Sequence, residues 1–274
     1  MTPIDIPSDL PAALIALAKE AGAAIMDVYE SDSRRDFGAT TKIDNSPLTE
    51  ADLRSHELIV AGLNALAPQW PVLSEESADI PFTDRARWTT YWLVDPLDGT
   101  KEFVSRNGEF TVNIALIHEH SPVIGVVYVP VLESLYVGGK GRGAFKQIGD
   151  GALSPIIPAV PANTPPRVIG SRSHRGELID AYLAGLGVHE LVTMGSSLKF
   201  CLLAEGRADL YPRLGPTSEW DTAAAQAVVE GAGGVVCLQD GSPLRYNTKA
   251  DVLNPFFFVY ADRSRDWLAT MRTM

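Results

Sequence analysis

The sequence contains little cysteine and no long apolar run. Its 274 residues include two cysteines, Cys201 and Cys237, and both lie within apolar stretches. We therefore expect buried free thiols in a reducing cytoplasm, with one disulfide as the alternative. No stretch approaches the ~20 apolar residues that span a bilayer, and the polar, Pro-rich first residues show no secretory signal. These absences predict a cytoplasmic protein without a transmembrane segment and leave open a peripheral contact with the inner membrane.

Positive charge is also scarce. Lys and Arg number 23 against 34 Asp and Glu, which gives a net charge of −11. No basic stripe is present, which argues against general nucleic-acid binding. A polyanionic substrate would need local cations, either metal ions or a few well-placed basic side chains. The apolar content of 46% and the charged content of 21% predict a packed globular core.

The first half of the chain predicts two helices packed on a meandering antiparallel sheet. Residues 8–30 have apolar positions at helical spacing, with Ser8 as N-cap, and a second helix runs from near Thr49 to Pro68. Short β-rich runs joined by short turns follow. They are Pro71–Ser74, Thr90–Val94, Thr111–His118, Val123–Val129 and Ser134–Val137.

The second half predicts an α/β layer. Pro155–Pro166 is typical of a linker, and strands then alternate with helices. The expected strands are Arg167–Gly170, Glu190–Met194, Ala208–Tyr211, Val235–Leu238 and Phe256–Tyr260. The expected helices are Gly176–Leu186, Ser196–Glu205, Glu219–Glu230 and one at the C-terminus. We expect residues 1–160 and 161–274 to form two subdomains.

Two carboxylates follow directly on an apolar strand at residues 92–100. Asp95 and Asp98 flank Pro96, and the Gly99-Thr100 turn comes after them. Proline restricts the backbone between the acids, and glycine permits a tight turn and close approach of a ligand. Two acids held in this way suit a hard divalent cation, which prefers oxygen ligands.

Three further acidic positions fall at the ends of expected elements: Asp52, the Glu75-Glu76 pair and Asp221. Each also has a simpler explanation. Thr49-x-x-Asp52 matches a capping box, Glu75-Glu76 could be a solvated turn, and Asp221 could favour the positive end of its helix. Taken together with the acids of residues 92–100, they favour a metal site.

A phosphate would be repelled by these acids without metal ions. One unit-charge pair at ~4 Å costs ~4 kcal/mol at an effective dielectric of 20. Two or three Mg²⁺ ions reverse the sign of this interaction, orient the phosphate and activate water.

The motifs together resemble the inositol monophosphatase superfamily of Mg²⁺-dependent, lithium-sensitive phosphatases, and within it the CysQ branch of 3′(2′),5′-bisphosphate nucleotidases. The resemblance runs from about residue 10 to about residue 260. It rests on residues 44–49, Glu75-Glu76-Ser77, 95–103, 106–115, 171–174, 195–201 and Trp220-Asp221. It implies an αβαβα layered fold with an antiparallel first sheet and a mixed second sheet. It also implies removal of the 3′-phosphate of 3′-phosphoadenosine 5′-phosphate by metal-activated water, giving AMP, in sulfate assimilation. The sulfated nucleotide is a second substrate, and no phosphoenzyme is expected.

The resemblance assigns metal ligands residue by residue. Glu75 binds metal and orients the attacking water, and Asp95 bridges two ions. The backbone carbonyl of Leu97 completes the shell of the first ion. Asp98 and Asp221 hold the second ion.

The resemblance also assigns catalytic and substrate contacts. Thr100 works with Glu75 or Asp52 to position the water, and the amides of Gly99 and Thr100 meet the phosphate. The full substrate-binding set expected is Glu75, Leu97, Asp98, Gly99, Thr100, Ser196, Ser197, Lys199 and Asp221.

Selection of a bisphosphate nucleotide needs a donor-rich pocket for the remote 5′-phosphate. Ser196, Ser197 and Lys199 open an expected helix and could supply it, although Lys199 could also be an ordinary solvated lysine. Arg172, His174 and Arg213 are weaker candidates for the same pocket. The sequence leaves monomer and homodimer equally open.

Three other functions remain as alternatives. An inositol monophosphatase would share the metal site and differ at residues 196–199. A Mg²⁺-dependent nucleotide-binding regulatory domain would lack turnover. A haloacid-dehalogenase-type phosphatase uses a nucleophilic Asp in Asp-x-Asp-Gly-Thr, whereas two residues separate Asp95 and Asp98 here. On an extended backbone that extra residue turns the second side chain to the other face.

Two patterns that imitate functional motifs are set aside. His118 and His120 have the alternate spacing of a zinc pair, but no third ligand is evident, and we interpret them as solvated surface. Gly138–Gly143 imitates a phosphate loop but leads into no helix, so we interpret it as a tight turn.

Overall fold

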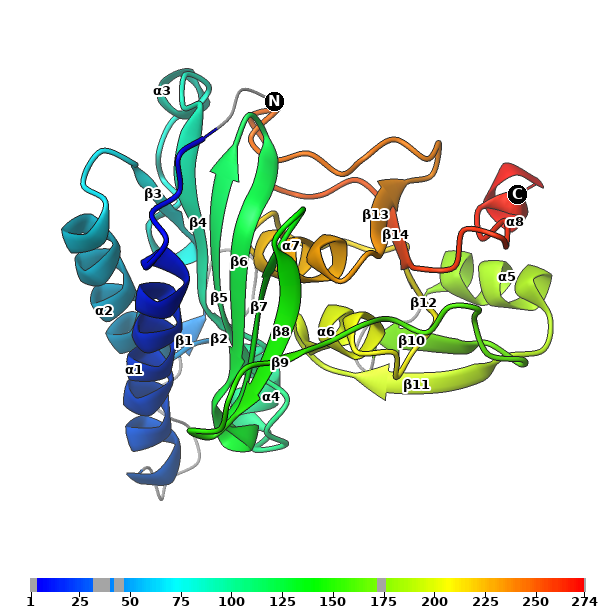
Figure 1. The fold of residues 1–274 in the computed structure, drawn as a ribbon, viewed down its shortest axis with the longest axis horizontal. Helices are drawn as coiled ribbons and strands as arrows, with labels where there is room; N and C mark the ends of the chain where they lie inside the picture. Colours follow the sequence, from blue (N-terminus) through cyan, green and yellow to red (C-terminus); the bar gives the residue numbers. More distant parts are fainter. Residues whose placement is uncertain (1–3, 32–39, 42–46, 172–175, 274) are drawn as a thin grey trace.

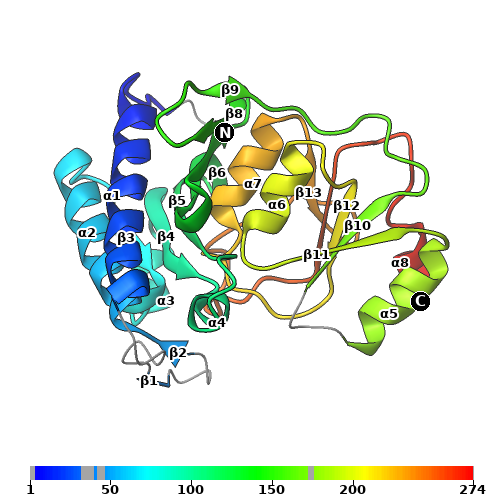
Figure 2. The same cartoon turned by 90° about the horizontal axis from the view of Figure 1, so that it is seen from below.

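The protein is built as five layers, helices and sheets alternating (Figure 1). A computed structural model describes residues 4–31, 40–41, 47–171 and 176–273. From one side to the other, the layers are α1 with α2, a seven-stranded sheet, α6 with α7, a five-stranded sheet, and α5 with α8 (Figure 2). The predicted αβαβα architecture is confirmed.

Eight α-helices and two short 3₁₀ helices lie in the described ranges. The α-helices are Leu10–Ser31 (α1), Glu50–Leu66 (α2), Phe82–Arg85 (α3), Thr100–Val104 (α4), Glu177–Leu186 (α5), Leu198–Ala204 (α6), Ala223–Gly231 (α7) and Ala269–Thr273 (α8). The 3₁₀ helices are Glu75–Ser77 (η1) and Pro130–Leu132 (η2).

The strands form two large sheets and one short pair. The short pair is Thr40–Thr41 (β1) with Pro47–Leu48 (β2). The first sheet contains Val72–Ser74 (β3), Thr90–Asp98 (β4), Thr111–His118 (β5), Ser121–Val129 (β6), Ser134–Gly139 (β7), Gly143–Ile148 (β8) and Ser154–Pro155 (β9). The second contains Arg167–Ser171 (β10), Glu190–Met194 (β11), Leu210–Arg213 (β12), Val235–Leu238 (β13) and Phe257–Tyr260 (β14).

The first sheet has the order β3-β4-β5-β6-β7-β8-β9. Every pair is antiparallel except β3 with β4, which is parallel. The prediction of a wholly antiparallel sheet is therefore wrong at this pair. Its physical reason is that residues 75–89, with η1 and α3, form a crossover long enough to return the chain in the same direction.

Helices α1 and α2 cover one face of the first sheet. Leu14 and Ile25 of α1 and Ile59 of α2 are fully buried in one cluster with Trp92 and Val94 of β4. These strand residues alternate with Tyr91 and Leu93, which face the opposite core. The alternation carries directly into Asp95, which follows on the same face as Leu93.

The first helix begins slightly later than predicted. Leu10 is its first residue, and the Leu10 and Ala13 N–H groups donate to the carbonyls of Pro7 and Asp9 at 3.1 Å each. Ser8 therefore lies in a turn before the helix rather than at its cap, because the chain is still turning after Pro7.

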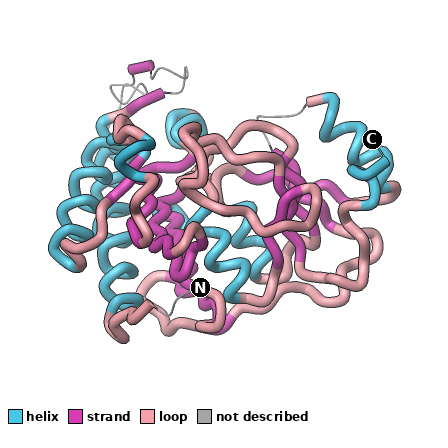
Figure 3. Tube along the Cα trace, turned by 90° about the horizontal axis from the view of Figure 1, so that it is seen from above, coloured by secondary structure: helices cyan, strands magenta, loops and turns pink. Residues whose placement is uncertain are grey.

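Helix α7 packs closely against the other face of the first sheet, and Figure 3 shows helices lying between the strands of the two sheets. A Cβ added to Gly125 of β6 would lie 2.2 Å from the carbonyl oxygen of Ala224, so only glycine permits this approach. Helix α6 lies between α7 and strands β12 and β14 of the second sheet. One apolar core thus joins the two sheets through these helices.

The second sheet has the order β11-β10-β12-β14-β13 and is mixed, as predicted. Strand β10 is parallel to β11 and β12, whereas β14 is antiparallel to β12 and β13. Its outer face packs on α5 and α8 around Tyr182 and Trp267. Residues 156–166 between the sheets contain no helix or strand, as the linker prediction requires.

Two expectations drawn from the composition can be checked in the described ranges. Cys201 and Cys237 are buried and free, as predicted. No described helix combines the length and the apolar character needed to cross a bilayer.

Candidate active site

A β-bulge in β4 brings the first two acids to one face of the sheet. Asp95 pairs with Asn113 of β5, and Asp98 pairs with Thr111, so three steps along β4 match two along β5. The extra residue restores the direction of the Asp98 side chain. Our expectation that the spacing turns these side chains to opposite faces is therefore wrong. Pro96 lies in the bulge, where its lack of an N–H breaks no ladder bond.

The third acid comes from the other half of the chain. Asp221 lies in the turn before α7, two residues ahead of its first residue, and does not open the helix as predicted. Its carboxylate instead accepts the N–H of Ser218 at 2.9 Å, which holds the turn outside the helix.

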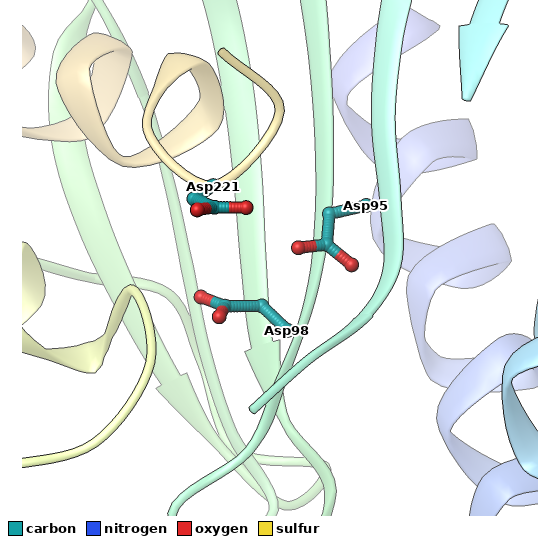
Figure 4. A group of neighbouring side chains, drawn as sticks. All are labelled: Asp95, Asp98 and Asp221. Carbon is teal, nitrogen blue, oxygen red and sulfur yellow. The ribbon is translucent and has the colours of Figure 1, made fainter. Parts of the chain in front are cut away.

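Carboxylate oxygens of Asp95, Asp98 and Asp221 all lie within 4.8 Å of one another. The three side chains point toward a common centre (Figure 4). Burial raises the pKa of Asp221 well above its ordinary value of 3.8, and the charges of Asp98 and Glu75 raise it further. The cluster is therefore strained as an assembly of bare anions and matches the oxygen donor set of a hard divalent cation.

A neighbouring amide supports the fit to a hydrated cation. Asn113 is 1% exposed, and its Oδ1 has no hydrogen-bond partner among the described residues. The Asn113 position faces Asp95 across the two strands. An unpaired buried carbonyl oxygen beside an acidic cluster is suited to accept a hydrogen bond from an ordered water.

Asp52 combines the two explanations offered for it. One carboxylate oxygen accepts the N–H and the hydroxyl of Thr49 at 2.9 and 2.5 Å, so the capping box is confirmed. The other oxygen accepts the hydroxyl of Thr100 at 3.4 Å. The Thr100 hydroxyl also lies 3.5 Å from the carbonyl of Leu97. Asp52 is fully buried and so reaches the site through Thr100.

One cavity of about 490 Å³ contains most of the predicted site. Glu75, from η1, lines it but lies outside the group of three acids within 4.8 Å. Eight other residues predicted for the site also line the cavity: Asp95, Leu97, Asp98, Gly99, Thr100, Ser196, Lys199 and Asp221. Ser197 does not line it. Arg172, His174 and residues 44–46 of the motif at residues 44–49 lie outside the described residues.

The cavity is also lined by basic and aromatic side chains, Lys199, Arg213 and Tyr211. Lys199 is 8% exposed, and its ammonium lies 5.9 Å from the centroid of the Tyr211 ring. Burial lowers the pKa of Lys199 to about 8, although Asp98 opposes this shift. Arg213 lines the same cavity. It is the last residue of β12, which begins and ends two residues later than predicted. The solvated-lysine interpretation of Lys199 is therefore wrong.

A buried tether behind Asp221 is absent from the sequence-based predictions. Glu219 accepts the N–H of Asn247 at 2.8 Å, and Arg85 of α3 donates to Asn247 Oδ1 and to the carbonyl of Ala250. Glu219, Arg85 and Asn247 are at most 2% exposed. The two acids that flank Trp220, Glu219 and Asp221, were a sequence signal for a structured turn. The partner network could not be inferred because Arg85 is distant in the sequence.

The two imitating motifs have structural roles. His118 is buried, and its Nδ1 lies 2.7 Å from the hydroxyl of Thr90, so its interpretation as solvated surface is wrong. His118 is the last residue of β5 and pairs with Thr90 of β4 on one side and Ser121 of β6 on the other. His120 lies separately against the carbonyl of Tyr246. Residues 138–143 form the β7–β8 hairpin turn, as predicted.

Comparison with known proteins decides the family. The model of the inositol monophosphatase family matches residues 7–264. The chain belongs to this family. The match spans both sheets and all of the acids described above.

Members of the family with high identity carry one name. A relative from Shigella flexneri, named 3′(2′),5′-bisphosphate nucleotidase CysQ, is 50% identical over 244 residues, 89% of this chain and 96% of the relative. The protein of that name from Haemophilus influenzae is 35% identical over 93% of each chain.

Solved structures agree. CysQ from Bacteroides thetaiotaomicron superposes with a TM-score of 0.81 at 45% identity and covers 93% of this chain and 98% of its own. The inositol monophosphatase from Thermotoga maritima has a TM-score of 0.78 at 20% identity, with 97% of both chains covered, and shares the fold.

Proposed function

We propose that this chain is a Mg²⁺-dependent 3′(2′),5′-bisphosphate nucleotidase. It removes the 3′-phosphate of 3′-phosphoadenosine 5′-phosphate with one water, giving AMP and phosphate, in the cytoplasm. The relatives named CysQ support the reaction. The observation that carries it is the convergence of Asp95, Asp98 and Asp221 in one cavity that is also lined by buried Lys199 and Arg213.

The cluster of acidic side chains in the cavity fits two or three Mg²⁺ ions. Asp95, Asp98, Asp221 and Glu75 would hold them, together with the backbone carbonyl of Leu97. When bound, the ions neutralise the phosphate and lower the pKa of water. The remaining groups would bind and orient the reactants.

Thr100 and Asp52 position the attacking water. Because the Thr100 hydroxyl donates a hydrogen bond to Asp52 Oδ1, its oxygen lone pairs are left to accept a hydrogen bond from the water. Glu75 would accept a hydrogen bond from the other O–H of the same water. The backbone N–H groups of Gly99 and Thr100 would donate to the phosphate, which orients it for in-line displacement.

The basic side chains of the cavity would select the nucleotide. A remote 5′-phosphate would lie against Lys199 and Arg213, with the hydroxyl of Ser196 beside them. Buried cations bind a phosphate more strongly than exposed ones because water screens them less. Inositol 1-phosphate has no second phosphate to place there.

A phosphate-release panel tests the proposal. The purified protein is assayed with 3′-phosphoadenosine 5′-phosphate, 3′-AMP and inositol 1-phosphate, each with Mg²⁺ or EDTA. We expect the bisphosphate to be cleaved fastest, only with Mg²⁺, and with inhibition by millimolar Li⁺. Faster cleavage of inositol 1-phosphate would reject the nucleotidase assignment, and a trapped aspartyl-phosphate would reject attack by water.

A further inference from the structure

Ser197 makes its hydrogen bonds away from the substrate cavity. It is 2% exposed and occupies the N-cap position of α6. A serine at this position ordinarily caps the helix through its hydroxyl, but the Ser197 side chain makes no cap bond. Its hydroxyl instead lies 2.7 Å from Asp98 Oδ2 and 2.5 Å from the backbone oxygen of Asp221.

The backbone N–H and the hydroxyl of Ser197 serve different partners, Asp98 and Asp221. Its N–H donates to Asp98 Oδ2 at 2.5 Å, so Ser197 binds this carboxylate through its backbone without using its hydroxyl proton. The single hydroxyl proton is then available for the carbonyl of Asp221. The side-chain amide of Asn113 donates to the Ser197 oxygen at 2.9 Å, which orients the hydroxyl.

Asp98 is anchored at one oxygen only. Its Oδ2 accepts the Ser197 N–H at 2.5 Å and, at 3.4 Å each, the Thr111 hydroxyl and the Asn113 side-chain amide. Three donors at one oxygen restrict rotation of the carboxylate and leave Oδ1 for a cation. Asp98 belongs to the first sheet and Asp221 to the turn before α7, so Ser197 joins the two sides of the acidic cluster.

The turn that carries Ser197 is itself held in place. The N–H of Gly195 donates to Glu109 Oε2 at 2.7 Å, and a Cβ at Gly195 would lie 2.8 Å from Glu102. Ser196 has a φ of 44°, a left-handed conformation that turns its side chain away from that of Ser197. Ser196 lines the cavity, and Ser197 does not.

We propose that Ser197 is a positioning residue that sets the separation of Asp98 and Asp221 for divalent-cation binding, and that it does not contact substrate. This inference rests on the proposed function because it assumes that the cluster holds Mg²⁺. It replaces the expectation that Ser196 and Ser197 act together on the 5′-phosphate.

Metal titration of the nucleotide-free protein tests the inference. Mg²⁺ and Mn²⁺ binding is measured by calorimetry for the wild type, Ser197→Ala, Ser197→Thr and Ser196→Ala, after circular dichroism has shown that each is folded. We expect Ser197→Ala to lose about 10–100-fold in metal affinity, as for other residues that orient metal ligands. Ser197→Thr keeps the hydroxyl and should stay within a few-fold of the wild type. Ser197→Gly removes the same hydroxyl at little cost to an N-cap and replaces Ser197→Ala if that variant does not fold.

Nucleotide kinetics complete the test. For Ser197→Ala, we expect the Mg²⁺ concentration for half-maximal rate to rise and the KM for 3′-phosphoadenosine 5′-phosphate at saturating Mg²⁺ to stay unchanged. Ser196→Ala should show the reverse. Unchanged metal affinity with a raised KM in Ser197→Ala would overturn the inference. Loss of metal affinity in Ser197→Ala alongside a wild type that is inactive on the nucleotide would instead overturn only the proposed substrate.

Discussion

Lys199 is a buried cation in a cavity otherwise dominated by acids, and its burial makes it a specific phosphate ligand. We expect Lys199→Gln to raise the KM for 3′-phosphoadenosine 5′-phosphate by about 10–100-fold, the value of a lost charge-assisted hydrogen bond of ~1.5–3 kcal/mol. The kcat should change little. Steady-state kinetics with 3′-AMP, which lacks the 5′-phosphate, provide the control. An equal loss for both substrates would show that Lys199 acts at the reacting phosphate.

The pH dependence of substrate capture follows from the same residue. The folded protein keeps Lys199 protonated only up to about pH 8, whereas the unfolded chain keeps it protonated to about 10.5. Its positive charge is therefore lost as pH rises through 8, and kcat/KM for the bisphosphate should fall there. Protein stability should gain slightly between pH 8 and 10.5, because the unfolded chain then binds more protons. The step should vanish in Lys199→Gln and with 3′-AMP; its persistence in both would assign it to another group.

The individual site residues were predictable to different degrees. Asp95 and Asp98 lie in the last residues of β4 and Asp221 lies just before α7, and local patterns find all three because each acid adjoins an apolar run. Ser197 was found as a residue but its contacts were not, because they depend on how α6 packs against β4. Asn113 is the one polar residue within residues 112–117, and this interruption of an apolar run was an available signal for a functional side chain.

Among the elements, the parallel β3–β4 pair and the bulge in β4 decide the site. Periodicity predicts strands but not an extra residue, and so it placed the two β4 acids on opposite faces. Pro96 was the available signal, since proline in a buried strand is confined to irregular positions. No local pattern predicted that β12 would begin at Leu210 and end at Arg213. The position of Arg213 in the cavity could therefore not be derived from the sequence.

The tether behind the Asp221 turn supplies a test at the element scale. We expect Arg85→Met to lower the free energy of unfolding by about 1–3 kcal/mol, because it leaves the buried Asn247 Oδ1 and the carbonyl of Ala250 without their donor. Denaturant unfolding measures this change. Arg54→Met is the matched control: Arg54 pairs with Glu50 at the surface of α2, and its removal should cost less than ~1 kcal/mol. Equal effects of the two substitutions would show that α3 does not brace the turn.

At the scale of the whole molecule, the acidic cluster joins residues that the two sheets hold apart. The fold class could be predicted because alternating strands and helices permit few layered arrangements. The division at residue 160 remains a prediction, since the α6–α7 layer shares one apolar core with both sheets.

Metal binding should therefore stabilise the whole fold. Mg²⁺ at 100 times its Kd should raise the free energy of unfolding by about 2.7 kcal/mol. In EDTA, Asp221→Asn should be at least as stable as the wild type, because it removes a buried acid whose pKa is raised by Asp98 and Glu75. Thermal unfolding with Mg²⁺, or with NaCl of equal ionic strength, checks both statements. If Mg²⁺ raised the stability of Asp221→Asn as much as that of the wild type, Asp221 would be excluded as a ligand.

The most direct measurement is anomalous diffraction from crystals grown with Mn²⁺ and phosphate. The account predicts anomalous peaks bounded by the carboxylates of Asp95, Asp98 and Asp221, at ligand distances of roughly 2.0–2.3 Å, with phosphate oxygens completing the coordination. Phosphate bound in the cavity without any metal peak among these three side chains would contradict it.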